Sequence, residues 1–428
     1  MSELSPGWAQ TTLGEIGQYL NGRGFKKSEW RELGRPIIRI QNLTGSGARF
    51  NYFDGEADER HIAREGDLLV SWAATLGVFV WHGPEAVINQ HIFKVESHVD
   101  RRFHRYVLQS SLADLQRQTH GSGMVHITKS KFDSTPVALP PLNEQRRIVA
   151  AIEKQLSRLD AADAALATAR VRARQFWEAV LEEAFTNHAS RRKVGDVAAL
   201  ADGPFGSNLK TSHYVAEGPR VLRLQNIGAG FFRDEKAHIA QEHFEGLLKH
   251  EVVPGDVVVA SLGEEPPRAC LVPEWLGDAI VKADCIRARS RGDVDASYLM
   301  WALNSRPVKA QAATRIKGIG RPRLGLGVIR DLEIPVPPLA KQQRIVAEVE
   351  ERLSVIDAMR ASINRAERRS ATLRRSILER AFRGELVPQD PSDEPASVLL
   401  ERIRITRGAD TVVKVRSGSR PAARRPVR

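Results

Sequence analysis

Two long stretches of the chain carry apolar residues at steps of three or four positions. They cover residues 143–185 and 340–382, and neither stretch contains proline or glycine. This spacing places the apolar side chains on one face of a helix and is typical of helices that pack along a shared seam. A double proline lies just before each stretch, where a helix can begin sharply. The pattern therefore predicts two long helices whose apolar faces pack together.

The segments before each long stretch show a different pattern, with short apolar or β-branched runs that end at Gly, Pro, Asn or Asp. Such runs predict β-strands. They cover residues 36–40, 67–70, 78–81, 92–95, 221–224 and 257–260. Residues 102–115 and 297–304 predict short helices. These segments are therefore expected to form mixed α/β domains.

The sequence contains a long internal repeat. Residues 143–185 match residues 340–382 at 17 of 43 positions, where roughly 3 matches are expected by chance. Upstream, residues 34–42 resemble residues 218–226. We predict an α+β protein with a pseudo-two-fold internal repeat. Its segments are domain 1 (1–139), the central long helix (140–187), domain 2 (188–336), the second long helix (337–387) and a basic, flexible tail (388–428).

Charge points to a polyanionic partner. The chain has 428 residues, with 64 Lys and Arg against 52 Asp and Glu, so its net charge is +12. Residues 402–428 hold nine basic residues and one acid, which accounts for +8 of this total. The body carries only about +4, so any binding of DNA by the body requires its basic groups to gather on one face.

Several classes of function lack support in the sequence. There are only two cysteines, no P-loop, no Rossmann spacing of glycines and no His-Glu-x-x-His motif. The longest uncharged apolar run, residues 68–81, is too short to span a membrane. Pro6 and Gly7 interrupt the place where a signal peptide would need its apolar region. We expect a non-catalytic, cytoplasmic protein without a bound metal.

Three motifs recur in both halves and carry side chains suited to DNA. Glycine-rich basic loops let backbone amides approach phosphates, and Arg, Gln and Asn at strand ends can pair with base edges. The candidate DNA contacts are Arg23, Lys26, Lys27, Arg39, Gln41, Asn42, Ser122, His126 and Lys129 in the first half, and Ser207, Asn208, Lys210, Arg223, Gln225, Asn226, Lys317, Arg321 and Arg323 in the second. For each motif, an ordinary surface turn or polar strand end is the alternative interpretation.

The double occurrence of Pro-Pro-Leu before the long stretches resembles a known family. With the segments that follow, 144–149 and 341–346, it is similar to the conserved helices of type I restriction-modification specificity subunits. Residues 89–93, 124–129 and 203–207 also resemble target-recognition sequences of that family. Lys341 stands where the family usually has Glu, which affects only the local capping of the helix.

This resemblance implies a division of labour among subunits. Two target recognition domains, held apart by an antiparallel coiled coil, would each read one half of a bipartite site in double-stranded DNA. Two methyltransferase subunits carrying S-adenosylmethionine would dock on the chain, and restriction subunits using ATP and Mg²⁺ would join them. The candidate partner-facing residues are Arg147, Glu153, Arg344 and Glu350.

Two other classes of function remain as alternatives to this interpretation of the sequence. A coiled-coil adaptor whose globular halves bind protein would show little affinity for DNA. A stand-alone DNA-modifying enzyme would need the cofactor loop that the sequence lacks.

Overall fold

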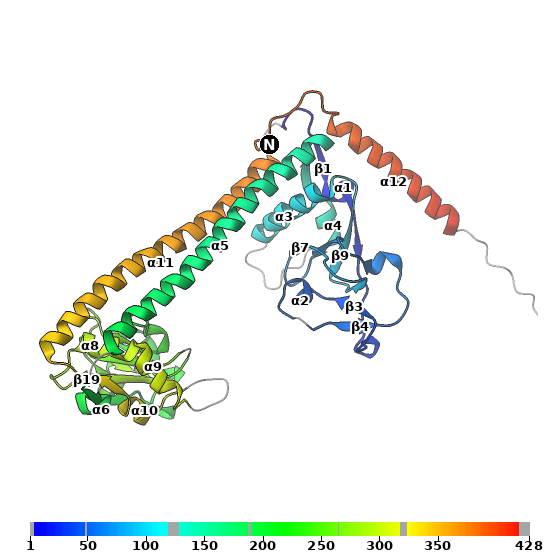
Figure 1. The fold of residues 1–428 in the computed structure, drawn as a ribbon. Coiled ribbons are helices and arrows are strands. Elements are labelled where there is room, and N and C mark those ends of the chain that lie inside the picture. The colour runs from blue at the N-terminus through cyan, green and yellow to red at the C-terminus, as the bar shows by residue number, and fades with distance from the viewer. Residues whose placement is uncertain are drawn as a thin grey trace, which may run out of the picture. The chain divides into compact units, whose positions relative to one another are not determined.

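The structure is a computed structural model, which describes residues 4–47, 49–118, 128–186, 190–263, 265–316 and 323–418 (Figure 1). The chain divides into two compact units. Unit 1 comprises Met1–Asp163 and Arg368–Arg428, and unit 2 comprises Ala164–Glu367. The boundaries fall within two long helices, α5 (Leu142–Thr186) and α11 (Leu339–Phe382). Each unit therefore contains one mixed domain and a part of both long helices.

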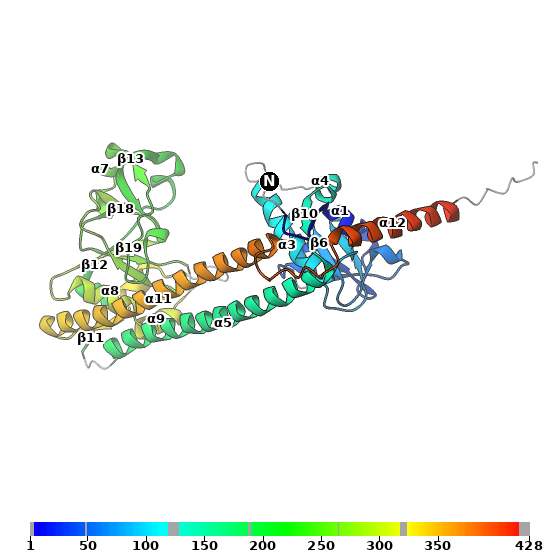
Figure 2. The same cartoon turned by 90° about the horizontal axis from the view of Figure 1, so that it is seen from above.

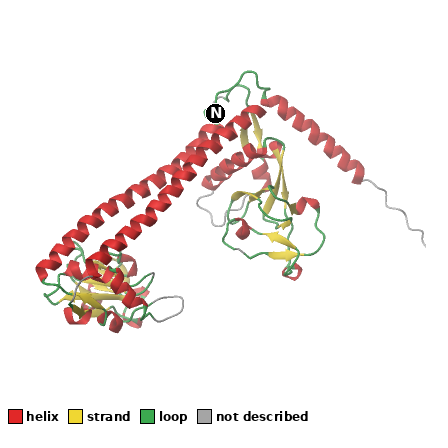
Figure 3. Cartoon of the chain, in the orientation of Figure 1, coloured by secondary structure: helices red, strands yellow, loops and turns green. Residues whose placement is uncertain are grey.

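The domain of unit 1 combines short strands with short helices (Figure 3). Its strands are β1 (Ala9–Thr12), β2 (Gly17–Asn21), β3 (Arg35–Ile38), β4 (Asn51–Phe53), β5 (Ile62–Ala63), β6 (Leu68–Ser71), β7 (Gly77–Val80), β8 (Ala86–Ile88), β9 (Ile92–Ser97) and β10 (Pro136–Leu139). Its α-helices are α1 (Leu13–Ile16), α2 (Ile40–Leu43), α3 (Arg101–Gln118) and α4 (Lys129–Asp133), and its 3₁₀ turns are η1 (Lys27–Glu29) and η2 (Glu59–His61).

The domain of unit 2 has the same kinds of element. Its strands are β11 (Arg191–Lys193), β12 (Ala198–Asp202), β13 (Tyr214–Leu222), β14 (His238–Ile239), β15 (Glu251–Val252), β16 (Val257–Ala260), β17 (Arg268–Leu271), β18 (Ala279–Val281), β19 (Cys285–Ser290) and β20 (Glu333–Pro335). Its α-helices are α6 (Val194–Val197), α7 (Gln241–Glu245), α8 (Ala296–Asn304), α9 (Arg306–Ala313) and α10 (Leu326–Arg330). Its 3₁₀ turns are η3 (Gly206–Asn208), η4 (Thr211–His213), η5 (Leu224–Asn226) and η6 (Leu248–His250).

The two domains share one sheet topology, which confirms the internal repeat. Unit 1 has a four-stranded sheet in the order β2-β9-β6-β7, and unit 2 has the matching order β12-β19-β16-β17. A second four-stranded sheet has the order β4-β3-β8-β5 in unit 1 and β14-β13-β18-β15 in unit 2. A two-stranded sheet, β1-β10 or β11-β20, precedes the long helix in each case. Three sheets of equal strand order establish that the halves share a fold despite their different sequences.

The long helices pack side by side and antiparallel. In unit 2, Arg170 contacts Glu367, whereas Glu183, further along α5, contacts Arg352, nearer the start of α11. In unit 1, Nη2 of Arg374 on α11 forms ion pairs with Oδ1 of Asp160 at 2.6 Å and with Oδ2 of Asp163 at 2.7 Å, both on α5. Both views show the two helices together within each unit (Figures 1 and 2). The predicted coiled coil is therefore confirmed.

Each long helix also supplies residues to the core of a domain. In unit 1, Ile148 and Ile152 of α5 pack with Phe103 and Leu108 of α3. In unit 2, Val349 and Leu353 of α11 belong to the core that contains the buried residues of α8. Burial of this apolar area stabilises the junction between helix and domain by the hydrophobic effect.

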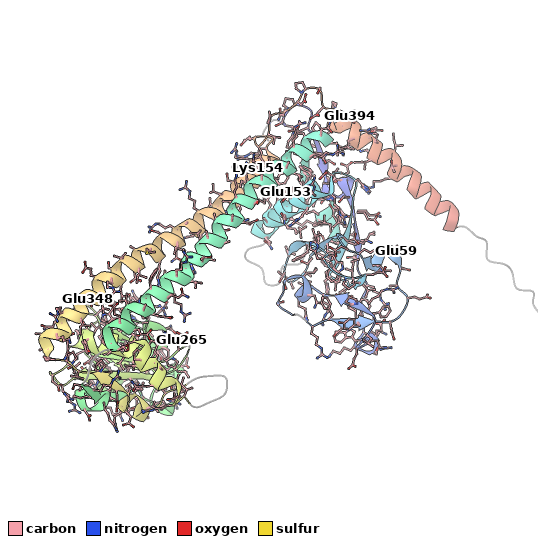
Figure 4. All side chains as sticks on the ribbon, in the orientation of Figure 1. Glu59, Glu153, Lys154, Glu265, Glu348 and Glu394 are labelled. Carbon is pink, nitrogen blue, oxygen red and sulfur yellow. The ribbon has the colours of Figure 1, made fainter. Side chains whose placement is uncertain are left out.

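The tail is not wholly flexible, contrary to our prediction for 388–428. Residues Ala396–Gly418 form helix α12. Ala396, Leu400 and Ile403, at helical spacing, are buried in the core of unit 1, and Arg404 pairs with Glu15 of α1 at 2.9 Å. Figure 4 labels Glu394, which lies just before this helix. The helix forms despite the Pro- and Arg-rich composition of the tail because its apolar side chains are buried against the core of unit 1.

A buried histidine predicts a pH dependence of the stability of unit 1. His104 is fully buried in α3, and the loss of hydration lowers its pKa to about 3 from 6.5. The Tyr19 hydroxyl donates to the Leu13 carbonyl and lies 2.8 Å from Nε2 of His104. The unfolded chain therefore binds this proton below pH 6.5 while the folded chain does not. Stability is full above pH 6.5, and about 2 kcal/mol is lost on acidification to pH 5.

Urea unfolding of the wild-type protein and of His104→Gln at pH 7.5 and pH 5 measures this contribution. Gln keeps hydrogen-bonding groups but does not titrate, so the fall in the free energy of unfolding should be smaller in the variant by about 2 kcal/mol. An equal fall in both proteins would contradict the assignment.

Candidate nucleic-acid interface

A tight turn between β18 and β19 organises one edge of unit 2. The amide of Cys285 donates to the carbonyl of Lys282 at 3.0 Å, and Asp284 adopts a positive φ of 68°. The amide of Gly203, which follows β12, donates to the carbonyl of Cys285 at 3.1 Å. A Cβ at Gly203 would lie 2.1 Å from the backbone carbon of Lys282, so only glycine allows this approach. The glycine-rich loop is thus fixed against the turn.

Two further segments reach the same turn. The amide of Ser261, after β16, donates to the carbonyl of Asp284 at 2.9 Å. The amide of Leu324 in turn donates to the carbonyl of Ser261 at 2.8 Å. We call residues 203–205, 261–262, 282–284 and Arg323 the edge cluster of unit 2. All three motifs predicted from the second half of the sequence therefore have described residues at or beside one edge.

Unit 1 has a corresponding turn with matching backbone hydrogen bonds but different side chains, and without the positive φ of Asp284. The amide of Ile92 donates to the carbonyl of Asn89, and the amide of Gly22 donates to the carbonyl of Ile92, both at 3.0 Å. The amide of Trp72 donates to the carbonyl of His91 at 3.3 Å. We call residues 22–24, 72 and 89–91 the edge cluster of unit 1. His91 here and Asp284 in unit 2 occupy the same place, directly before β9 and β19.

The residues after β3 and β13 also lie beside these turns. The carbonyl of Ile38 accepts from the amide of Asn89, and the carbonyl of Leu222 accepts from the amide of Lys282. Arg39 and Arg223 come directly after these carbonyls. The strands β3 and β13 end at Ile38 and Leu222, earlier than predicted, because α2 and η5 begin at Ile40 and Leu224. Gln41 and Gln225 are exposed on these short helical turns.

Asn42 and Asn226 do not fit their predicted role as base contacts. Asn226 is fully buried, and its amide donates to the carbonyls of Arg233 and Glu235 while its oxygen accepts from the amide of Arg223. Asn42 makes the corresponding bond with the amide of Arg39 at 3.0 Å. We therefore correct both assignments to a structural role, in which the asparagine is the third residue of a helical turn and its side chain accepts from the amide of the N-cap arginine.

The candidate DNA-contacting residues differ in their exposure and in their ion-pair partners. Arg23 is half-buried, stacks on the rings of Phe25 and Phe53 and pairs with Glu29. Arg323 is half exposed in the edge cluster of unit 2. Lys26, Lys27, Lys129, Asn208 and Lys210 are exposed, and Lys129 pairs with Asp133. Ser122, His126, Lys317, Arg321 and the side chain of Ser207 lie outside the described residues.

The candidate partner-facing residues fall into two groups. Within unit 1, Arg147 forms an ion pair with Asp393 at 2.6 Å, and Glu153 forms an ion pair with Arg102 at 3.3 Å. Glu153 is labelled in Figure 4. Glu350 receives a 3.4 Å hydrogen bond from the Trp301 indole, and it is exposed on α11 like Arg344. Arg344 and Glu350 are thus exposed on α11, whereas Arg147 and Glu153 are partly buried on α5.

A buried glutamine near the N-terminus of each long helix was not predicted from the sequence. Gln342 donates to the carbonyl of Pro337 at 2.8 Å and accepts from the amide of Asp295 at 2.9 Å. Gln145 makes the same two bonds, with Pro140 and the amide of Asp100. The presence of this glutamine at the same position in both copies of the repeat could have indicated its role. Through these hydrogen bonds, Gln145 connects α5 to the N-terminus of α3, and Gln342 connects α11 to the N-terminus of α8.

Clusters of metal-ligating side chains and cysteine thiols are two further kinds of group that can carry chemistry. No three His, Cys, Asp or Glu side chains among them gather in a way that could hold a metal ion. Burial raises the pKa of the Cys270 thiol to about 12 and also raises the pKa of Cys285, so both stay protonated at neutral pH. No helix in the described part of the chain is long and apolar enough to cross a membrane.

Comparisons with known proteins agree on one family. Residues 6–165 match the family model described as the type I restriction modification DNA specificity domain. The specificity subunit of the type I restriction enzyme EcoBI from Escherichia coli is 24% identical, over 98% of this chain and 94% of its own. The EcoKI specificity subunit of E. coli strain K12 is 22% identical, over 99% of each chain.

A solved structure shares the fold. It comes from a study of complex assembly and conformational transition of the type I R-M system. Its chain is 18% identical with a TM-score of 0.71 and is matched over 90% of this chain and 100% of its own. The fold of two mixed domains and two long helices is therefore that of a known architecture.

Proposed function

Because the chain belongs to the specificity subunits of type I restriction-modification systems, we propose that each domain reads one half of a bipartite DNA site with its edge cluster. The observation that carries this proposal is the matching set of backbone hydrogen bonds around the two turns, which places His91 in unit 1 and Asp284 in unit 2 at the same position before β9 and β19. Equal scaffolds with unequal side chains suit two half-sites of different sequence. Exposed lysines beside the glycine-rich loops, Lys26, Lys27 and Lys210, would contact phosphates.

We propose that two methyltransferase subunits dock along the helical pair and that restriction subunits join this complex. Support comes from apolar side chains that the helices leave open in unit 2. Phe176 of α5 is 59% exposed, and Val355 and Met359 of α11 are 61% and 44% exposed. Val355 and Met359 are four residues apart and share a face, so they can contact one partner surface. Arg344 and Glu350 add charge along the same helix.

The catalytic chemistry would reside in the partners. We place S-adenosylmethionine on the methyltransferase subunits and ATP with Mg²⁺ on the restriction subunits, and we assign no catalytic step to this chain. Its two described cysteines are buried and unpaired, as in proteins of a reducing cytoplasm. The adaptor alternative does not explain a scaffold whose basic loops recur at both edges.

A base-resolution map of DNA methylation tests the proposal. Cells that hold the chain with the methyltransferase of its own system are compared with cells that lack only this chain. We expect a split motif of two half-sites that disappears with the chain. An identical map in both cells, with folded chain and active methyltransferase, would contradict the proposal.

The end of the tail should add affinity without specificity. Residues 409–428 hold six basic residues and one acid, whereas the contacts of Leu400, Ile403 and Arg404 precede them. Truncation after Gly408 should lower the affinity of the complex for unrelated duplex and reduce the salt slope by about 0.9 for each phosphate that the tail no longer neutralises. Salt titrations of binding measure this change.

The control for this truncation is stability. The shortened chain should unfold within about 0.5 kcal/mol of the full chain, because the buried side chains of α12 remain in place. A changed sequence preference in the truncated complex would show that these residues read bases.

A further inference from the structure

Arg323 is held in place from two sides. Its Nη2 lies 2.8 Å from Oδ1 of Asp284, and its guanidinium carbon lies 5.3 Å from the centre of the Phe205 ring. The backbone bridge between Arg323 and Leu262 fixes the start of the side chain. Yet the Arg323 side chain remains 49% exposed. The Arg323 side chain is thus oriented within the edge cluster while about half of it stays exposed.

This arrangement suits the recognition of one base. An arginine fork matches the O6 and N7 acceptors of guanine in the major groove, and no other base presents that pair. A free arginine side chain loses conformational entropy when it binds. Asp284 and Phe205 restrict this side chain before DNA arrives, so less of that loss remains. The ion pair with Asp284 involves only Nη2 of the guanidinium, which carries five N–H groups in all.

The carboxylate that orients Arg323 comes from a strained position. Asp284 is one of few described residues other than glycine with a positive φ, and the bonds of Ser261 to its carbonyl keep it there. Strain at such a position persists where the surrounding structure imposes it and is concentrated at functional sites. The turn therefore directs this carboxylate at Arg323.

We propose that Arg323 reads a guanine in the half-site of unit 2 and that Asp284 is its positioning residue. This inference rests on the proposed function and names the base and the residue pair that select it. In unit 1 the place of Asp284 is taken by His91, whose ring packs against Trp72 at 5.5 Å. The same pair is therefore absent from the described part of the edge cluster of unit 1, and the two half-sites need not share this guanine.

The test compares base preference at every position of both half-sites for complexes of the full chain with its methyltransferase. Competition binding uses duplexes that carry each base in turn. R323A should lower the preference for guanine at one position of the unit 2 half-site by about tenfold or more. R323K keeps the charge but not the fork, so it should lose the same preference while retaining more affinity for unrelated DNA.

D284N separates the role of Asp284 from the fold of the turn. Asparagine tolerates a positive φ, so the backbone is kept while the charge is lost. We expect a smaller loss of the same guanine preference. R192A is the matched control, because Arg192 is 40% exposed and paired with Asp293 on β11, outside the edge cluster. It should leave both half-sites unchanged.

The outcomes distinguish this inference from the proposed function. An equal loss for all four bases in R323A, or an unchanged unit 2 half-site, overturns the role of Arg323. Wild-type discrimination in D284N overturns the positioning role of Asp284. Failure of the proposed function would instead appear in the wild-type complex, as the absence of any split recognition sequence.

Discussion

Gly203→Ala is expected to destabilise unit 2 by about 1–3 kcal/mol and to weaken discrimination at its half-site only. The added Cβ would lie 2.1 and 2.2 Å from the carbonyl carbon and oxygen of Lys282. These are backbone atoms, so the turn itself must move, and Asp284 moves with it. Urea unfolding and the methylation map measure the two effects.

The repeat supplies a reciprocal experiment. A Cβ at Gly22 would lie 2.3 Å from the carbonyl oxygens of both Ile88 and Asn89, so Gly22→Ala should weaken the unit 1 half-site instead. Gly327→Ala is the control, since nothing lies within 4 Å of its new Cβ and the residue is in helix α10. Loss of both half-sites in a single glycine variant would contradict the assignment of one site to each edge cluster.

Gln342→Ala should cost about 2–5 kcal/mol, the larger of the two stability effects. The variant removes the partner of the part-buried amide of Asp295 and of the buried carbonyl of Pro337, at roughly 1–3 kcal/mol each. Because these hydrogen bonds connect the N-terminus of α11 to α8, we also expect more frequent local opening at this end of the helix. Denaturant unfolding gives the free energy, and limited proteolysis detects the opened junction.

The neighbouring residue offers a matched control. Gln343 is exposed on the next position of α11, so Gln343→Ala should change the free energy of unfolding by less than about 0.5 kcal/mol. Gln145→Ala should behave like Gln342→Ala, but in unit 1. If both alanine variants of α11 have equal stability, the buried bonds of Gln342 contribute little.

The elements with a regular apolar period could be predicted from the sequence. The long helices, α3, α8 and the central strands of the sheets depend on local spacing, and the structure has them close to the predicted bounds. Helix α12 was missed because the surface that buries Leu400 and Ile403 comes from residues near the start of the chain. Composition alone cannot report a partner so distant in sequence.

The candidate site could be predicted only as a set of motifs. Arg323 and Asp284 are far apart in the sequence, so no spacing rule pairs them. Asn226 has the same chemistry whether it caps a turn or reads adenine, and only its burial decides between these roles. Sequence indicates which side chains can contact DNA, whereas the turns decide which of them remain available.

The division of the chain also sets an order of events during its synthesis. Unit 2 is one continuous segment, whereas the core of unit 1 needs Ile377, Ala381 and Leu400 from the end of the chain. At 5–20 residues per second, a ribosome spends roughly 10–40 s between the two parts of unit 1. During that interval unit 2 can fold while the nascent first domain keeps apolar surface exposed. The domain translated first is therefore completed last, and in this period it depends most on chaperones.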